Sequence, residues 1–216
     1  MNISERNKAR AKSVDHTFFS EINTEAKAWC LGLMFSDGNV SKSKAEIWLC
    51  MSDLDVIEKF RSCIQSESKI HKHPKKDESN KQLYRLVFTS HPIKADLIRH
   101  GCTPAKSMTL KYPVELNTGY ERHFIRGIFD GDGSVTVTSK TKQASIAGTV
   151  DIVEWIHVVL NHNGIGSSIF VLKSGTAILS LHTKSNNLIK FREYLYSGAT
   201  LWMDRKFNKF NQLITK

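Results

Sequence analysis

Two aspartates, Asp37 and Asp132, hold the same place in two similar nine-residue segments, and this repetition is the strongest chemical pattern in the chain. The segments read CLGLMFSDG at 30–38 and IRGIFDGDG at 125–133, each with Gly third, an acid eighth and Gly ninth. The matching positions are 95 residues apart. An internal repeat of this kind predicts two units of one structure that pack against each other.

The placement of both acids predicts a metal-dependent reaction. Each follows an apolar helical run, so it lies at a helix C-terminus, where the dipole disfavours negative charge by about 0.3–1 kcal/mol. If the two helices lie side by side, the carboxylates converge and repel each other unless a cation lies between them. Paired carboxylates suit Mg²⁺, and this arrangement beside a polyanion predicts phosphodiester hydrolysis. Ordinary Asp-Gly turns would explain either copy alone, but explain the shared register poorly.

Two glycines inside the helical runs, Gly32 and Gly127, predict how the helices meet. Glycine in a helix interior costs about 1 kcal/mol relative to alanine. Its presence at the same register in both copies favours a helix interface with close backbone approach. The alternative is two tolerated glycines on unrelated helices.

The segments that follow each copy also match in kind, because alternating polar and apolar residues predict strands and longer periods predict helices. In the first half we expect strands at 40–44, 45–51, 67–74 and 82–89, and helices from near Asp53 and at 92–100. In the second half we expect strands at 134–140, 143–149, 167–173 and 176–183, and helices from Val150 and at 184–196. The fold class is therefore α+β, with two pseudo-symmetric αββαββα repeats. We expect a basic arm at 1–20, a first repeat with linker at 21–112 and a second repeat at 113–216.

These two nonapeptides resemble the paired signature of the LAGLIDADG homing endonucleases in their monomeric, two-motif form, and the resemblance extends over roughly residues 14–212. In that family the eighth-position acids bind the catalytic metals, which implies Asp37 and Asp132 here. The resemblance also implies metal-binding backbone carbonyls just before them, and a catalytic basic residue after the last helix of each repeat. These positions correspond to Ser36, Gly131, Lys106 and Lys206.

Two departures from the family's pattern matter. The sixth position is Phe35 in the first motif but Asp130 in the second, and Arg126 replaces the small second residue. Neither is the metal-binding position, so we expect the helix packing to differ between the repeats and the activity to survive.

The resemblance implies two four-stranded antiparallel sheets that form a saddle over a duplex of roughly 20 base pairs. Side chains that face away from the core would read bases, since Arg and Lys pair with guanine and Gln with adenine. The alternative for any one of them is an ordinary solvated sheet face. The candidates are Ser41, Ser43, Lys44, Arg85, Thr136, Thr138, Lys140, Gln143, Ser145, Ser180 and His182.

Charge and cysteine content are consistent with this interpretation. The chain has 31 Lys plus Arg against 21 Asp plus Glu, a net charge of +10, which favours a nucleic-acid partner. The four cysteines lack CxxC spacing and are expected to pack as free thiols in a reducing compartment, although a disulfide or zinc stays open. In the lysine-rich segment 69–81, His71 and His73 share a strand face, a spacing that also leaves zinc open.

The sequence thus predicts a site-specific double-strand DNA endonuclease that acts as a monomer with Mg²⁺, for which Mn²⁺ or Ca²⁺ could substitute in binding. The alternatives are an intron RNA maturase and a non-cleaving DNA-binding protein with the same fold. No apolar run is long enough for a membrane span. Because the N-terminus lacks a secretory signal, we expect an intracellular protein, in the cytoplasm of a bacterial or phage host or in an organelle.

Overall fold

The computed structural model describes residues 14–73, 81–182 and 186–213, and contains two sets of elements in the same order. The first set consists of α2 (Glu25–Ser36), β1 (Gly38–Val40), β2 (Glu46–Met51), α3 (Leu54–Cys63), β3 (Ile70–Lys72), β4 (Tyr84–Thr89) and α4 (His91–Arg99). The second consists of α5 (Glu121–Asp132), β5 (Gly133–Val137), β6 (Lys142–Thr149), α6 (Val150–His162), β7 (Ser167–Val171), β8 (Thr176–Leu181) and α7 (Asn187–Tyr196). Two short 3₁₀ helices, η1 (Lys106–Met108) and η2 (Thr118–Tyr120), lie between the sets, and α8 (Asp204–Asn211) follows the second.

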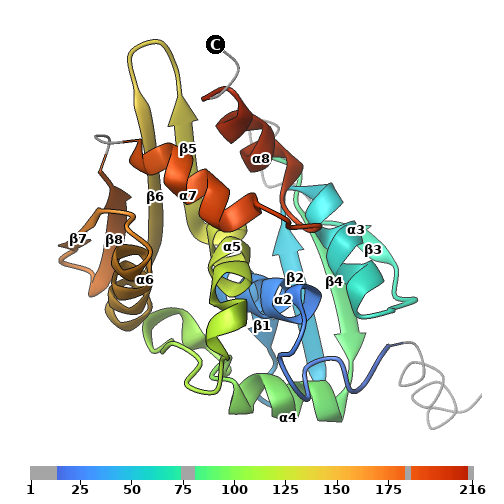
Figure 1. The fold of residues 1–216 in the computed structure, drawn as a ribbon. Coiled ribbons are helices and arrows are strands. Elements are labelled where there is room, and N and C mark those ends of the chain that lie inside the picture. Colours follow the sequence, from blue (N-terminus) through green and yellow to red (C-terminus); the bar gives the residue numbers. More distant parts are fainter. Residues whose placement is uncertain (1–13, 74–80, 183–185, 214–216) are drawn as a thin grey trace, which may run out of the picture.

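Each set forms one four-stranded antiparallel sheet. The strand orders are β1-β2-β4-β3 and β5-β6-β8-β7, so the two sheets share one topology. The predicted α+β class with two αββαββα repeats is confirmed. Figure 1 shows the sheets on opposite sides of a central pair of helices, α2 and α5.

The two central helices are enclosed on all sides. Residues 28–35 of α2 and 123–130 of α5 are buried without interruption, and these stretches are again 95 positions apart. Because an amphipathic helix buries only one face, this continuous burial places both helices in the middle of the molecule. They form the principal contact between the two repeats.

Backbone contact at two glycines brings these helices together. A Cβ atom built on Gly32 would collide with the Phe124 carbonyl oxygen and lie 2.9 Å from the Gly127 Cα. A Cβ on Gly127 would collide with the Trp29 carbonyl oxygen. The two helices therefore meet backbone to backbone at Gly32 and Gly127.

A glycine just after a helix commonly adopts the left-handed conformation. The glycines that end the two motifs, Gly38 and Gly133, have a different role. Gly133 has φ −82°, so it needs no left-handed conformation. The chain passes at once from helix to strand, and a Cβ on Gly38 would lie 2.5 Å from the Met34 Cα, while one on Gly133 would meet Phe129. The absent side chain is what lets each strand begin directly beneath its helix.

Several predicted boundaries are wrong, for local reasons. The first strand covers 38–40 rather than 40–44, because residues 41–45 turn, with Ser41 N donating to the Glu46 carbonyl oxygen. The strand expected at 134–140 stops at 137, where Thr138 N donates to Thr141 O. The strands expected at 67–74, 167–173 and 176–183 are shorter, at 70–72, 167–171 and 176–181, and the helix expected at 184–196 begins at 187. The helix α8 has no counterpart in the predicted element order.

Residues 14–20, expected in a basic arm at 1–20, pack on the first repeat instead. Val14, Phe18 and Phe19 are buried, and the His16 ring bonds the Ser90 hydroxyl at 2.7 Å. Residues 1–13 and most of the lysine-rich tip within 69–81 lie outside the described residues. The other boundaries, 21–112 and 113–216, stay predictions. The four cysteines are free, as expected, and none of the described helices could cross a membrane.

Replacing Gly32 or Gly127 with alanine tests the helix contact. Helix propensity alone would favour alanine by about 1 kcal/mol. A methyl group forced between two backbones should outweigh this, so the free energy of unfolding should fall by about 1–3 kcal/mol, and further with leucine. Urea denaturation measures the change. Gly119→Ala is the control, since its Cβ would find only the Asn117 side chain, at 3.5 Å. Equal stability of all three alanine variants would contradict the packing.

Candidate metal centre and nucleic-acid interface

The two repeated aspartates meet at one end of the helix pair. Asp37 caps the C-terminus of α2, and Asp132 is the last residue of α5. A Cβ built on Gly131 would lie 2.5 Å from Asp37 Oδ2, which places the Asp37 carboxylate against the end of α5. Asp37 is half-buried and Asp132 is exposed. The structure therefore brings both carboxylates to one spot, as the repeat predicts.

The electrostatics of this spot disfavour two negative charges. Removal from water, with the nearby Asp132 charge as the second cause, raises the pKa of Asp37 to about 6. Partial removal from water also raises the pKa of Asp132. Lys106 and Lys206 act against both shifts. The two carboxylates and the two lysines therefore form one electrostatic unit.

Both lysines are buried and hold the ends of the motif helices. Lys106 Nζ donates to the Ser36 carbonyl oxygen at 3.1 Å. Lys206 Nζ donates to the carbonyl oxygens of Phe129 at 2.5 Å, Asp130 at 2.8 Å and Gly131 at 3.4 Å. A positive charge at a helix C-terminus is favourable, and a helix leaves its last carbonyls short of backbone donors, although Phe129 O also accepts from the N–H of the C-cap residue Gly133. The lysines thus satisfy helix ends while placing positive charge beside the carboxylates.

The surroundings of the two lysines differ. Lys106 lies in η1, whereas Lys206 lies inside α8 rather than in a loop. Burial lowers the pKa of Lys206 to about 8, and the Asp130 carboxylate is the largest opposing influence. Lys206 therefore stays mostly protonated at neutral pH although only 3% of it is exposed.

The two unusual residues of the second motif build a buried polar network. Asp130 Oδ2 accepts from Trp29 Nε1 of α2 at 2.8 Å and from Met203 N, just before α8, at 3.0 Å. Arg126 donates to Glu25 of α2 at 2.5 Å and to the Leu195 carbonyl oxygen at 2.6 Å. These bonds join α2 and α5 to the C-terminal part of the chain that contains Leu195 and Met203.

At the position that corresponds to Asp130, the first repeat has only apolar packing. Phe35 makes an edge-to-face contact with Phe124 at 5.0 Å between ring centroids. The expected difference in helix packing between the repeats is confirmed. Sequence reasoning missed Glu25, whose only signal was an acid at the start of the first motif helix.

The donor atoms at the centre fit a hard divalent cation. Two carboxylates converge, and the pKa of each is raised in the metal-free protein, so a cation would relieve an existing electrostatic cost. Among the described residues no group of three or more His, Cys, Asp or Glu side chains could hold a metal. Phosphate and water oxygens would have to complete the coordination, as Mg²⁺ commonly requires.

On the second sheet, the predicted base-reading residues share the face opposite the helices. Thr136 pairs with Gln143 and Ser145 with Ser180, while the alternate residues Ala144, Ile146 and Leu179 are buried. Thr138 and Lys140 belong to the β5–β6 turn instead of a strand. His182 follows β8, and its Nε2 bonds Ser168 Oγ at 2.8 Å.

On the first sheet, only Arg85 of the predicted set lies in a strand. Its guanidinium lies 4.6 Å above the Trp48 ring centroid, a cation–π contact on the open face. Ser41, Ser43 and Lys44 lie in the β1–β2 turn, where the Ser41 hydroxyl accepts from Lys44 N. Strand pairing adds open-face residues that the sequence left out, because periodicity does not give register: Asn39, Trp48, Val87, His71, Ser134, Ser168, Phe170 and Ile178.

A model of the LAGLIDADG-like domain matches residues 119–196, which contain the second motif and the second sheet. The resemblance to the LAGLIDADG family is therefore confirmed, with the family-model match confined to this repeat. No curated protein sequence matches the chain.

Solved structures share the two-repeat LAGLIDADG fold over almost the whole chain. The homing endonuclease I-DmoI is 16% identical with TM-score 0.58, covering 87% of this chain and 97% of that one. I-DmoI in complex with DNA and Ca is 15% identical with TM-score 0.57, with the same coverage. Full-length DUF199/WhiA from Thermatoga maritima is 13% identical with TM-score 0.58, covering 93% of this chain and 64% of that one. At these identities the likeness shows the fold alone.

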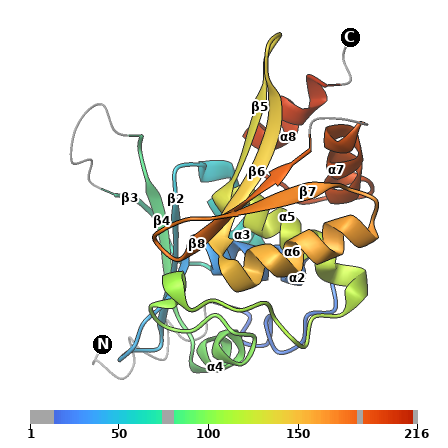
Figure 2. The ribbon, with the colours of Figure 1, turned by 90° about the vertical axis from the view of Figure 1, so that its left-hand side faces the viewer.

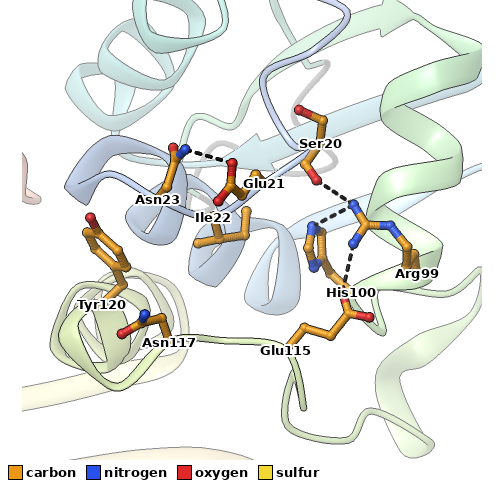
Figure 3. A pocket seen from close by; sticks show the side chains of 9 residues that line it. All are labelled: Ser20, Glu21, Ile22, Asn23, Arg99, His100, Glu115, Asn117 and Tyr120. Carbon is orange, nitrogen blue, oxygen red and sulfur yellow. Dashed lines mark hydrogen bonds and ion pairs between the residues drawn. The ribbon is translucent and has the colours of Figure 1, made fainter.

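A pocket also lies at the opposite end of the helices α2 and α5 (Figure 3). Its lining includes Asn23, just before α2, and Tyr120, just before α5. Arg99 spans its wall, donating to the Ser20 carbonyl oxygen at 2.6 Å and to Glu115 at 2.7 Å. Because a twelve-residue helix is about 18 Å long, this pocket is remote from the carboxylates. Its contacts join the linker to the first repeat.

The raised pKa of Asp37 predicts that Asp37→Asn stabilises the metal-free protein. The folded pKa is about 6 against an ordinary 3.8, so the cost of the charge is fully present above pH 6. At pH 7.5 the substitution should increase the free energy of unfolding by about 1–2 kcal/mol. The gain should shrink as the pH falls from 6 to 4, where the wild-type carboxyl binds a proton on folding. Denaturation at several pH values with chelator measures this, with the exposed Glu67→Gln as control. A loss of stability at pH 7.5 would contradict it.

Proposed function

We propose that this protein is a site-specific endonuclease that hydrolyses phosphodiester bonds in both strands of double-stranded DNA. The observation that carries the proposal is the convergence of Asp37 and Asp132 with Lys106 and Lys206 at the ends of two close-packed helices. Two sheets with open faces flank this centre, and the chain has a net charge of +10. A polyanion lying across both sheets would bring its backbone to the carboxylates.

Asp37 and Asp132 would hold the divalent metal, with the carbonyl oxygens of Ser36 and Gly131 as further ligands. When bound, Mg²⁺ supplies an activated water and stabilises the leaving oxygen. Mn²⁺ or Ca²⁺ would support binding in its place. Structures of I-DmoI in complex with DNA contain Ca or Mn, which supports divalent metal use in a protein of this fold.

The chain's own residues prepare the centre. Lys106 and Lys206 neutralise part of the carboxylate charge and would attract the phosphate that lies between them. Their hydrogen bonds to the helix ends fix the backbone that carries the acids. Such preorganised charge is effective because it needs no rearrangement during the reaction. Asp130 positions Lys206 by bonding the backbone at the start of α8.

A DNA-binding protein without cleavage is the second candidate. Lys206 already donates to the Gly131 carbonyl oxygen, and Lys106 to that of Ser36, so each competes with a metal for that atom. The same fold also occurs in DUF199/WhiA, so the fold alone does not fix the activity. Under either function we propose a monomer, because each motif helix already has its partner helix in the same chain.

The two acids give the decisive test between these candidates. Asp37→Asn and Asp132→Asn should each abolish nearly all cleavage of the target in Mg²⁺, because both would hold the metal. The double variant should be little worse, since groups that act as a unit lose their effect together. Binding should survive, because affinity comes from phosphate and base contacts on the sheets. A plasmid cleavage assay and gel-shift titration measure both properties. Wild-type protein that binds but never cuts in any divalent metal would establish the second candidate.

Salt dependence tests the proposed DNA face. Lysines that neutralise phosphates release counterions, so affinity should fall steeply between about 50 and 200 mM salt. Lys140→Gln, in the exposed β5–β6 turn, should reduce the slope of log K against log salt by about one. Glu67→Gln should leave the slope unchanged. Fluorescence anisotropy gives these slopes, and an affinity independent of salt would exclude the basic surface as the binding face.

A further inference from the structure

The open face of the second sheet carries an apolar row next to a polar one. Ile178 of β8 pairs with Ala147 of β6 and with Phe170 of β7, so the three side chains lie side by side across three strands. Phe170 is 58% exposed, while the flanking residues Ala177 and Leu179 of β8 are buried. The row therefore points away from the helices and into solvent. Figure 2 turns β7, β8 and α6 of the second repeat toward the viewer.

The neighbouring row consists entirely of serines. Ser134, Ser145, Ser180 and Ser168 follow one another across all four strands. Small hydroxyl side chains leave room for close approach and accept or donate hydrogen bonds with little selectivity. Of these two rows, the apolar row is thus the chemically selective one.

The charge around the row is complementary to DNA. The four described strands of this sheet contain no acidic residue, while exposed lysines stand at the hairpin ends, Lys140 and Lys142 on one side and Lys173 on the other. A polyanion would be attracted to this rim. Within the major groove of DNA the apolar feature is the C5-methyl group of thymine.

The equivalent row of the first sheet has the opposite chemistry. Gly38 pairs with Leu49, and Gly133 with Ile146, which aligns the two sheets at the start of each first strand. On this alignment Cys50, Arg85 and His71 take the places of Ala147, Ile178 and Phe170. At one pair of equivalent positions, therefore, the first repeat presents the guanidinium of Arg85 and the second repeat presents the apolar side chain of Ile178.

We propose that the row formed by Ala147, Ile178 and Phe170 reads thymine methyl groups in one half of the target, whereas Arg85 reads guanine at the equivalent place in the other half. This inference rests on the proposed function, specifically on DNA lying across the open faces. It names the base composition of the two halves, A·T pairs under the second sheet and a G·C pair under the first. A non-palindromic target follows from it.

Uracil substitution isolates the methyl group. A target is first obtained by binding selection from a randomised duplex library, and thymines are then replaced one at a time by deoxyuridine. Burial of one methyl group is worth about a threefold to fivefold change in affinity, so uracil should weaken binding by this factor at one or two positions in a single half. The same replacements in the other half should have no effect.

Protein variants link that effect to the row. Phe170→Ser should bind the thymine target more weakly and lose the difference between thymine and uracil, because the methyl contact is then already absent. Ser168→Ala, in the neighbouring row of the same strand, should keep the difference. Phe170 is largely exposed, so unchanged thermal unfolding of Phe170→Ser is the check on folding.

The outcomes separate the inference from the proposed function. A selected target without thymine in one half, or uniform tolerance of uracil, overturns the inference and leaves the DNA-binding function intact. Phe170→Ser that changes self-association but not DNA affinity also overturns it and assigns the row to a protein contact. If the selection yields no target at all, the proposed function and the inference fail together.

Discussion

The contact between the backbones of α2 and α5 is the constraint on which the remaining structure depends. Two glycines remove the side chains that would otherwise hold the helix axes apart, and eight consecutive residues on each helix become buried as a result. Because the helices pack at the same register, their C-termini lie side by side. The first strand of each sheet begins directly after its helix at this place. The position of the carboxylates is therefore a direct consequence of helix packing.

That position has an electrostatic cost that neighbouring groups reduce without removing. Removal from water disfavours ionisation of Asp37 and Asp132, and the Asp132 charge adds to that cost at Asp37. Two buried lysines compensate through the same helix ends. Strain of this kind is typical of functional sites, where stability is lower than the fold could provide. The buried bonds of Glu25 with Arg126 and of Trp29 with Asp130 support the centre from behind, and their motif residues, Arg126 and Asp130, occur only in the second motif.

Pseudo-symmetry in this molecule is a property of the backbone more than of the side chains. Both sheets share strand order and pairing, yet the open faces differ row by row, with Arg85 against Ile178 and His71 against Phe170. Even the two lysines sit in different elements, η1 and α8. Duplication within one chain allows this divergence, because each half is free to change while the helix interface stays matched.

The sequence alone predicted the repeat, the fold class, the helix-packing glycines and the central acids, because each of these depends on residue type and spacing. Strand ends at 41–45 and 138–141 were misplaced, since a local turn hydrogen bond, invisible in the polar pattern, stops the ladder. The apolar row at Ile178 and the partnership of Glu25 with Arg126 required the tertiary structure. Alternation tells which residues share a face of one strand, but only pairing between strands and packing between repeats decides which residues from distant segments become neighbours.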